Sequence, residues 1–149
     1  MTKLRCLFDT NVLVAAVIGY GLCFSLLAVA EREVVRHYTS REILEELAEV
    51  LARPKIGFAP KRIRSIVRRI SAVSHVIETT QTPKVIQSDA DDNVILACAL
   101  SAKARYLVTQ DPDFLKLGTY KQVLFVSPEM FRGILAEQGI QLSARDKSS

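Results

Sequence analysis

Residues 4–13, Leu-Arg-Cys-Leu-Phe-Asp-Thr-Asn-Val-Leu, decide the fold of this chain. Leu4 to Phe8 form a short, mostly apolar run of strand length, and an apolar helical pattern resumes at Val12. A run that is apolar on both faces is typical of a central parallel strand covered by helices, and such sheets bind ligands at the carboxyl ends of their strands. Asp9 follows the predicted strand and lies at that end. A structural alternative stays open, because Asp9 or Asn11 is also a good N-cap for the next helix.

The composition predicts one folded domain rather than a disordered or disulfide-stapled chain. The chain has 149 residues, 49% of them apolar, and a modest net charge of +4. Its three cysteines have no metal-binding spacing, and its two histidines are isolated, which argues against a zinc site. These residues are Cys6, Cys23, Cys98, His37 and His75. With no signal-peptide pattern and no apolar run of membrane-spanning length, we expect a cytoplasmic protein that does not associate with membranes.

Strand-like and helix-like segments alternate along the chain. Strands are predicted at residues 4–8, 34–38, 73–77, 105–109 and 122–126. Helices are predicted at residues 11–18, 22–32 and 40–53, from residue 60 onward, from the acidic cluster at 88–93 to about 104, and from 128 to 138. This alternation predicts a three-layer α/β/α fold around a mostly parallel sheet with right-handed crossovers. We expect one domain over residues 1–138 and a flexible polar tail over residues 139–149.

The helix predicted over residues 40–53 carries a second candidate acid. Thr39 and Glu42 have the spacing of a capping box at its start. Glu45 and Glu49 lie nearly opposite its apolar stripe, where solvated carboxylates belong, whereas Glu46 lies on the border of the stripe. The stripe consists of Ile43, Leu44, Leu47, Val50 and Leu51. A border carboxylate can lean over the end of the sheet, although an ordinary boundary glutamate would look the same.

Two further groups of acids follow strand-like regions. Asp89, Asp91 and Asp92 lie within four residues at the start of an apolar helix. Acids in the first turn suit the helix dipole, but three carboxylates exceed what a cap needs, so a nearby cation is plausible. Asp111 comes directly after the strand predicted at residues 105–109, so another strand delivers a carboxylate at its carboxyl end.

Residues 54–77 are basic, with no acidic residue between Glu49 and Glu78. The basic side chains flank an apolar helical stripe that begins near Pro60, and they are Lys55, Lys61, Arg62, Arg64, Arg68 and Arg69. Charge runs are usually solvated helix faces. A run without a compensating acid is better interpreted as a phosphate-binding surface, although few aromatic residues are interleaved with it.

The predicted architecture can bring four separate acids to one end of the sheet, and they are Asp9, Glu46, Asp92 and Asp111. Several carboxylates in one pocket repel each other unless a cation lies between them. Hard oxygen ligands suit Mg²⁺ or Mn²⁺. Beside a basic surface, such a site suits metal-assisted hydrolysis of phosphodiesters.

The chain resembles the PIN-domain nucleases, in the branch that includes VapC-like toxins, over about residues 4 to 138. The resemblance rests on the order and spacing of four segments, which are residues 8–13 (Phe-Asp-Thr-Asn-Val-Leu), 43–47 with 51–55 (Ile-Leu-Glu-Glu-Leu and Leu-Ala-Arg-Pro-Lys), 92–97 (Asp-Asn-Val-Ile-Leu-Ala) and 107–114 (Leu-Val-Thr-Gln-Asp-Pro-Asp-Phe). The family fold implies a five-stranded parallel sheet flanked by helices. The family also implies Mg²⁺- or Mn²⁺-dependent cleavage of single-stranded RNA, a homodimer, and inhibition by an antitoxin protein.

The resemblance implies roles for individual residues. The catalytic and metal-binding quartet corresponds to Asp9, Glu46, Asp92 and Asp111, with Asp113 as a further acid and with Thr10, Asn11 and Thr109 as polar neighbours of the site. The expected RNA-binding residues are Lys55, Lys61, Arg62, Arg64 and Arg68. Glu45 competes with Glu46 for the second place, and Asp89 or Asp91 competes with Asp92 for the third.

A phosphotransferase and a silent binding module remain as alternatives, whereas a phosphoacceptor signalling domain does not. A haloacid-dehalogenase-like phosphotransferase also places a nucleophilic aspartate after its first strand, but it needs a second aspartate two residues later, where this chain has Asn11. A phosphoacceptor signalling domain needs an acidic pair after the first strand, and this pair is absent. The second alternative is a catalytically silent module that binds RNA or a protein partner.

Overall fold

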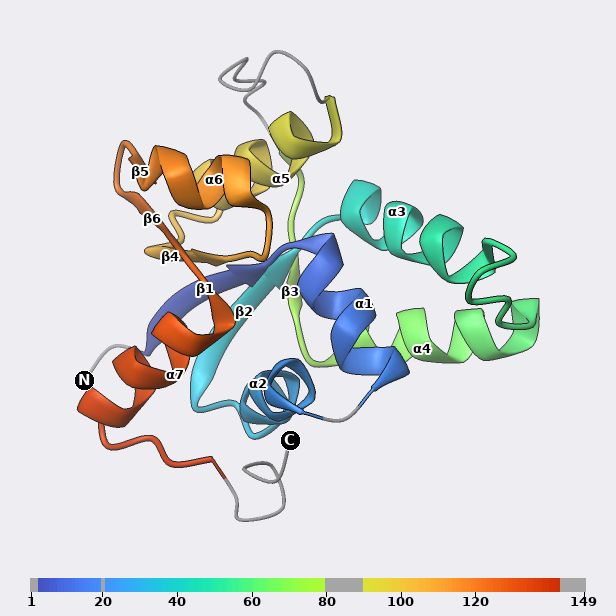
Figure 1. Ribbon diagram of the computed structural model, residues 1–149, viewed down its shortest axis with the longest axis horizontal. Helices are drawn as coiled ribbons and strands as arrows, with labels where there is room; N and C mark the ends of the chain where they lie inside the picture. The colour runs from blue at the N-terminus through green and yellow to red at the C-terminus, as the bar shows by residue number, and fades with distance from the viewer. Residues whose placement is uncertain (1–2, 20, 80–89, 143–149) are drawn as a thin grey trace.

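The computed structural model describes residues 3–19, 21–79 and 90–142 (Figure 1). The strands are β1 (Leu4–Phe8), β2 (Val35–Thr39), β3 (His75–Val76), β4 (Tyr106–Val108), β5 (Thr119–Tyr120) and β6 (Val123–Val126). The helices are α1 (Thr10–Ile18), α2 (Leu22–Glu31), α3 (Arg41–Ala52), α4 (Pro60–Ala72), α5 (Ala90–Ser101), α6 (Pro112–Leu117) and α7 (Pro128–Glu137). The loop predicted over residues 79–87 lies almost wholly outside the described residues.

One sheet with the strand order β3-β2-β1-β4-β6-β5 forms the centre of the fold. All pairs are parallel except β5 with β6, so the predicted α/β class and mostly parallel sheet are confirmed. The described sheet has six strands rather than the predicted five. The additional strand is β5, a two-residue strand that turns back onto β6 through Lys121, whose φ is 53°.

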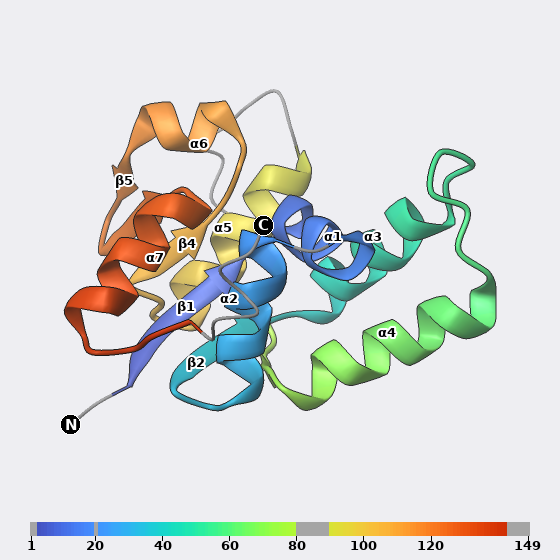
Figure 2. The same ribbon diagram turned by 60° about the horizontal axis from the view of Figure 1, so that its bottom comes forward.

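Helices cover both faces of the sheet. α1, α2 and α7 lie together on one face, and α5 and α6 lie on the other (Figures 1 and 2). The hairpin of α3 and α4 extends beyond the β3 edge (Figure 1). The chain runs outward from β1 to β2 and β3, and then returns to β4 on the opposite side of β1. The order of the strands therefore reverses between β1 and β4, which is where open α/β sheets bind their ligands.

The start of α3 differs by one residue from the prediction. Its N-cap is Ser40, whose hydroxyl accepts a hydrogen bond from Ile43 N at 3.3 Å, and not Thr39. Thr39 instead remains in β2, because it pairs with Val76 of β3. The predicted capping box is therefore wrong, since Glu42 is only two residues beyond the true cap. The cap predicted for α7 is confirmed, because Ser127 Oγ accepts from Met130 N at 3.1 Å.

The chain continues to pack after α7. Leu142 is buried, and Arg32 Nη2 donates to the carbonyl of Gln141 at 3.0 Å, so residues of the predicted tail still contact the core. Residues 143–149 lie outside the described part. Within that part, no single helix is long and apolar enough to cross a membrane, and α1 with α2 meets the requirement only as a pair bent by 99°. The three cysteines are buried and free.

His37 of β2 connects the end of β1 to the end of α4. Phe8 N donates to His37 Nε2 at 3.2 Å, so the proton of the neutral ring lies on Nδ1, which is 2.7 Å from Ser74 Oγ. The hydroxyl of Ser74 donates in turn to the carbonyl of Ile70 at 2.6 Å. Burial, with a smaller contribution from His75, lowers the pKa of His37 from 6.5 to about 3. His37 is therefore a neutral structural link.

Replacing His37 by glutamine should flatten the dependence of stability on pH. Because the pKa of His37 is lower in the folded state than its ordinary value of 6.5, the unfolded state binds the proton more readily. The stabilising contribution is complete above pH 6.5 and is lost progressively as the pH falls toward about 3. Urea unfolding midpoints of His37→Gln should thus fall less steeply than those of wild type over this range. His75→Gln, on an exposed site, should follow wild type, and parallel curves for all three proteins would contradict the assignment.

Candidate active site

The predicted acids after β1 and β4 lie side by side at the reversal of strand order. β1 and β4 pair in parallel with Phe8 opposite Val108, and Asp9 N extends the ladder by donating to the Val108 carbonyl at 2.9 Å. The carboxyl ends of these strands therefore meet at one edge. Asp9 and Thr109, the residues that directly follow these strands, are in contact through a hydrogen bond of 2.7 Å.

Asp9 is held by hydrogen bonds on both carboxylate oxygens. Its Oδ1 accepts from Thr10 N at 2.7 Å, which caps α1, and its Oδ2 accepts from the hydroxyl of Thr109 at 2.7 Å. Asn11 Nδ2 lies 3.4 Å from the same Oδ2. Asp9 as a whole is only 5% exposed, and a buried charge needs such donors. The two roles considered for Asp9, helix cap and member of a polar site, are thus compatible.

Thr109 connects Asp9 to the segment after β4. Its hydroxyl donates to Asp9 and accepts from Asp111 N at 3.0 Å. Asp111 Oδ1 accepts from Asp113 N at 2.9 Å and so caps α6, while the side chain of Asp113 is exposed. Asp111 is therefore linked to Asp9 through a single intermediate residue, Thr109, which is fully buried.

The structure brings Glu46, rather than Glu45, to the turn that holds Asp9. Thr10 Oγ1 donates to Glu46 Oε2 at 3.1 Å, while Thr10 N bonds to Asp9. One residue thus contacts both acids. Glu46 is half-buried on the border of the α3 stripe, as its angular position predicts, whereas Glu45 is exposed and faces a different groove.

The third predicted acid is placed only by its backbone. Asp92 lies in the first turn of α5, whose bounds are Ala90–Ser101, but its side chain is outside the described residues. The side chain of Asp91 is also outside the described residues, and Asp89 precedes the described segment. The choice among these three acids therefore stays a prediction. Among the side chains that are described, no three acidic, histidine or cysteine groups lie close enough together to hold an ion.

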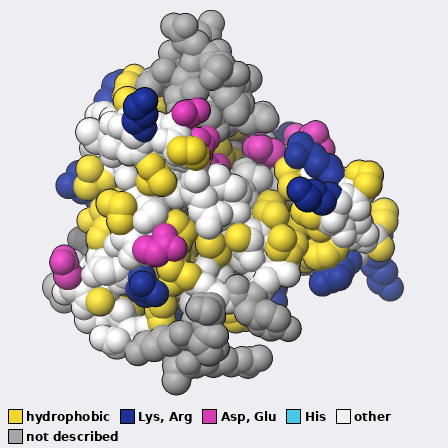
Figure 3. All heavy atoms as spheres, in the orientation of Figure 1, with side chains coloured by type: hydrophobic (Ala, Val, Ile, Leu, Met, Phe, Trp, Pro, Cys, Tyr) yellow, Lys and Arg dark blue, Asp and Glu magenta, His cyan; other side chains and the backbone are white. Residues whose placement is uncertain are grey.

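The chemistry of the donors nevertheless fits a hard divalent cation. The side chains that bond to Asp9 and Glu46 in the described part of the chain include the hydroxyls of Thr10 and Thr109 and the carboxamide of Asn11. Oxygen ligands of this kind suit Mg²⁺ or Mn²⁺. Acidic side chains also gather on the visible surface between α6 and α3 (Figure 3).

Gln110 was not predicted as part of the site. Its backbone N donates to Asn11 Oδ1 at 3.2 Å, so the carboxamide of Asn11 contacts both Asp9 and the segment after β4. A backbone donor beyond the last strand pair needs a partner outside the ladder. This requirement is the only signal in the sequence that points to Gln110, and it does not identify the partner.

One arginine of the basic run at residues 54–77 has an acidic partner. Arg69 Nη2 lies 2.9 Å from Glu31 Oε1, and Glu31 belongs to α2. The sequence argument considered only acids nearby along the chain, and it therefore missed a partner 38 positions away. Arg69 was not among the predicted RNA-binding residues.

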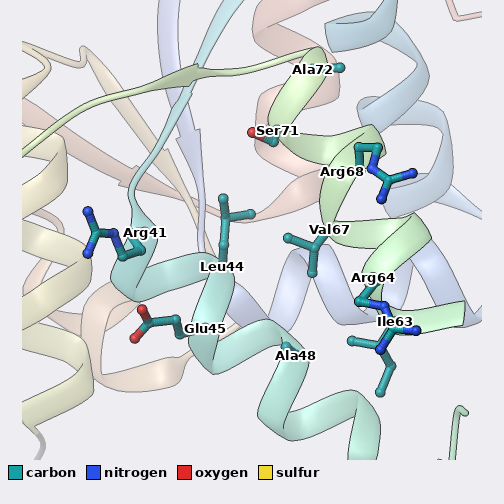
Figure 4. Close-up of a pocket in the computed structure, with 10 residues that line it drawn as sticks. All are labelled: Arg41, Leu44, Glu45, Ala48, Ile63, Arg64, Val67, Arg68, Ser71 and Ala72. Atoms are coloured by element: carbon teal, nitrogen blue, oxygen red, sulfur yellow. The ribbon is translucent and has the colours of Figure 1, made fainter. Parts of the chain in front are cut away.

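The five predicted RNA-binding residues lie in more than one place. Lys55 and Lys61 are exposed where α3 connects to α4. The guanidinium of Arg62 lies 3.8 Å from the centre of the Phe58 ring, and Arg62 borders a pocket that is also lined by residues of α1 and α2. Arg64 and Arg68 instead border a groove between α3 and α4 (Figure 4). The structure therefore does not bring the five together as one surface.

Fold and site together define an α/β domain with carboxylates gathered at the reversal of strand order. The chain belongs to the PIN domain family, since the family model described as PIN domain matches residues 5–113. The resemblance seen in the sequence is confirmed. Members of this family are generally nucleases.

Solved structures share this fold at low sequence identity. A chain in the crystal structure of VapBC2 from Rickettsia felis, bound to a DNA fragment from their promoter, is 15% identical with a TM-score of 0.60, over 82% of this chain and 97% of that one. The RRP44 PIN domain of T. brucei is 12% identical with a TM-score of 0.52, over 93% of this chain and 84% of that one. No curated protein sequence matches the chain.

Removing the hydroxyl of Thr109 should destabilise the fold. Thr109→Val keeps the shape of the side chain but leaves the buried carboxylate of Asp9 without one donor, which should cost about 1–3 kcal/mol. Thr109→Ser keeps the hydroxyl and should lose clearly less. Urea unfolding in EDTA measures both without a contribution from metal. A larger loss in Thr109→Ser than in Thr109→Val would show that the methyl group of Thr109, and not its hydroxyl, is the important part.

Proposed function

We propose that this PIN domain is a metal-dependent endoribonuclease that hydrolyses phosphodiester bonds of single-stranded RNA. The observation that carries the proposal is the double contact of Thr10, whose backbone N bonds to Asp9 and whose hydroxyl bonds to Glu46. Two carboxylates from distant segments are thereby directed to one place. In the proposal the ion is Mg²⁺ or Mn²⁺, and its ligands are drawn from Asp9, Glu46, Asp92, Asp111 and Asp113.

The residues of the chain prepare this site before substrate arrives. Thr10 and Thr109 fix the orientation of the Asp9 carboxylate, and hydrogen-bonded carboxylates of this kind make well-ordered ligands. Asn11 holds the segment after β4 against Asp9 through Gln110 N. A divalent ion bound there would supply Lewis acidity toward the phosphate and would lower the pKa of a water. By the family resemblance, the products should carry a 5′-phosphate and a 3′-hydroxyl.

The geometry disfavours the phosphotransferase alternative. That mechanism requires an aspartate two residues after Asp9 to exchange a proton with the substrate. Asn11 occupies the place, and its carboxamide is engaged with Asp9 and with Gln110 N. A silent binding module would retain the fold without hydrolysis, and the metal-dependent cleavage assay below separates it from the proposed nuclease.

We further propose that the protein is the toxin of a toxin–antitoxin pair, acting in the cytoplasm as a homodimer. The likeness of its fold to a chain of the VapBC2 complex supports the proposal of an antitoxin partner. The PIN domain assignment supports the nuclease activity of such a toxin. In this proposal RNA backbone is contacted by the exposed Lys55 and Lys61 and by Arg62.

Glu46→Gln should abolish the response to metal without disturbing the fold. A glutamine oxygen can still accept from Thr10 Oγ1, so stability in EDTA should stay near that of wild type, while one anionic ligand is lost. Wild type should gain thermal stability in millimolar Mn²⁺, because an ion that binds only the folded state stabilises it. Glu46→Gln should gain much less and should cleave an RNA oligonucleotide at least about tenfold more slowly.

Glu45→Gln is the matched control for this measurement. It removes the same charge from the neighbouring residue, which is exposed on another side of α3. It should behave as wild type in both assays. A similar loss in both variants, cleavage that persists in excess EDTA, or products that end in cyclic phosphate would contradict the proposed chemistry. Asp9→Asn is a poorer test, because an amide nitrogen at Oδ2 could not accept from Thr109.

Charge reversal at the α3–α4 connection should weaken RNA binding. The double variant Lys55→Glu, Lys61→Glu loses two exposed cations, and it should bind an oligouridylate less tightly with a salt dependence that is flatter by roughly 1.4, since each neutralised phosphate of a single strand contributes about 0.7. The control is Lys103→Glu, Lys121→Glu, which makes the same change in charge at exposed positions. These residues precede β4 and β6, so they lie at the amino ends of the strands, whereas Asp9 lies at the carboxyl end of β1. Equal effects of the two double variants would point to net charge alone.

A further inference from the structure

Three arginines lie side by side at the amino ends of the adjacent strands β2, β1 and β4. Arg36 is paired with Arg5 in the parallel register of β1 and β2. Arg105, the residue before β4, donates from its backbone N to the carbonyl of Arg5 at 3.0 Å. Neighbouring strands are about 4.8 Å apart, so the three backbone positions, here called the arginine row, span about 10 Å. The row lies at the opposite end of β1 from Asp9.

The arginine row concentrates positive charge at a cost to the fold. Arg5 and Arg36 occupy paired positions, so their side chains leave the same face of the sheet, where like charges repel each other. Neither ion pair between side chains in the described part of the chain includes a residue of the row. The fold therefore does not neutralise this charge, and an external anion bound there would relieve the repulsion.

Contacts with the protein orient two of the three guanidinium groups. Arg5 Nη1 donates to the carbonyl of Ala102 at 3.1 Å, and the guanidinium carbon lies 5.8 Å from the centre of the Tyr38 ring. Arg105 Nη1 donates to the carbonyl of Gln122 at 3.2 Å. A guanidinium group has five N–H donors, so each of these retains donors for a ligand. Because both side chains are already ordered, an anion that binds them pays less of the cost of ordering them.

We propose that the arginine row binds a compact polyphosphate, which is the linear phosphate chain of an inorganic polyphosphate or of a nucleotide. Phosphate oxygens match the planar, bidentate donor geometry of arginine. Consecutive groups of such a chain share a bridging oxygen, so a short chain brings several negative charges within the span of the row. The site is separate from the candidate active site, and the proposal does not require nuclease activity.

Single-stranded RNA fits the row less well than a compact polyphosphate. Proteins that bind single strands offer aromatic rings on which the bases stack. Tyr38 is buried, and the guanidinium of Arg5 lies over its ring. The half-buried Tyr106 packs against Phe131, with 5.8 Å between the ring centres. The aromatic side chains beside the row therefore serve the fold and the arginines rather than a base.

The test titrates the full-length protein with inorganic triphosphate in metal-free buffer, followed by calorimetry and by NMR shifts of backbone amides. We expect saturable shifts at Arg5, Arg36 and Arg105 and a Kd at least about tenfold lower than that of orthophosphate at equal ionic strength. A parallel titration with ATP distinguishes the two sources of the chain. Equal affinity assigns the site to the phosphate chain from either source, and binding of ATP that is tenfold tighter assigns it to nucleotides.

Neutral variants of the row supply the decisive comparison. Arg36→Gln, Arg105→Gln removes two exposed cations and should raise the Kd for triphosphate at least about tenfold. Lys55→Gln, Lys61→Gln removes the same charge at the connection of α3 and α4 and should leave the Kd within about twofold of wild type. Without ligand, Arg36→Gln should unfold in urea at a midpoint no lower than that of wild type, because it relieves repulsion with Arg5.

Three results would overturn the proposal. The first is triphosphate binding no tighter than that of orthophosphate. The second is an equal loss in the two double variants, which would indicate net charge alone. The third is an oligouridylate or an acidic peptide that shifts the amides of the row at lower concentration than triphosphate does, which would assign the surface to nucleic acid or to a protein partner.

Discussion

The hydrogen bond from Thr109 Oγ1 to Asp9 Oδ2 joins the two strands between which the strand order reverses. Asp9 is only 5% exposed, and a buried carboxylate is stable only when its oxygens are paired, so the segment after β4 must follow β1 closely at this edge. The same hydroxyl accepts from Asp111 N and thereby fixes where α6 begins. The position of Asp111 relative to Asp9 thus follows from the requirement to pair one buried charge.

α3 serves two surfaces because successive residues of a helix are turned by about 100°. Glu46 faces Thr10 and the carboxyl ends of the strands, whereas Glu45 lines the groove on the α4 side. The hydroxyl of Ser40 fixes the first turn of the helix, and Leu47 is fully buried in the core. The helix is therefore oriented by its cap and its apolar stripe, and neither surface needs to be occupied for the other to form.

Local geometry explains which parts of the site could be predicted from the sequence. The place of Glu46 depends only on its angle relative to the apolar stripe of its own helix, and the structure puts it there. The cap of α3 was misplaced by one residue because pairing of Thr39 with β3, a tertiary contact, extends β2. Similarly, the partner of Arg69 is Glu31, on another helix, and no local pattern contains that information. Contacts between distant segments set the details that periodicity misses.

The contacts that hold α4 in place determine which of its faces is left to line the groove with α3. Its C-terminal end is tied to β1 through Ser74 and His37, and its middle is tied to α2 by the ion pair of Arg69. Both ties lie on the sides that face the sheet and α2, so neither uses the residues of α4 that line the groove with α3. The helix thereby presents Val67 and its neighbours to a groove without losing its place on the core.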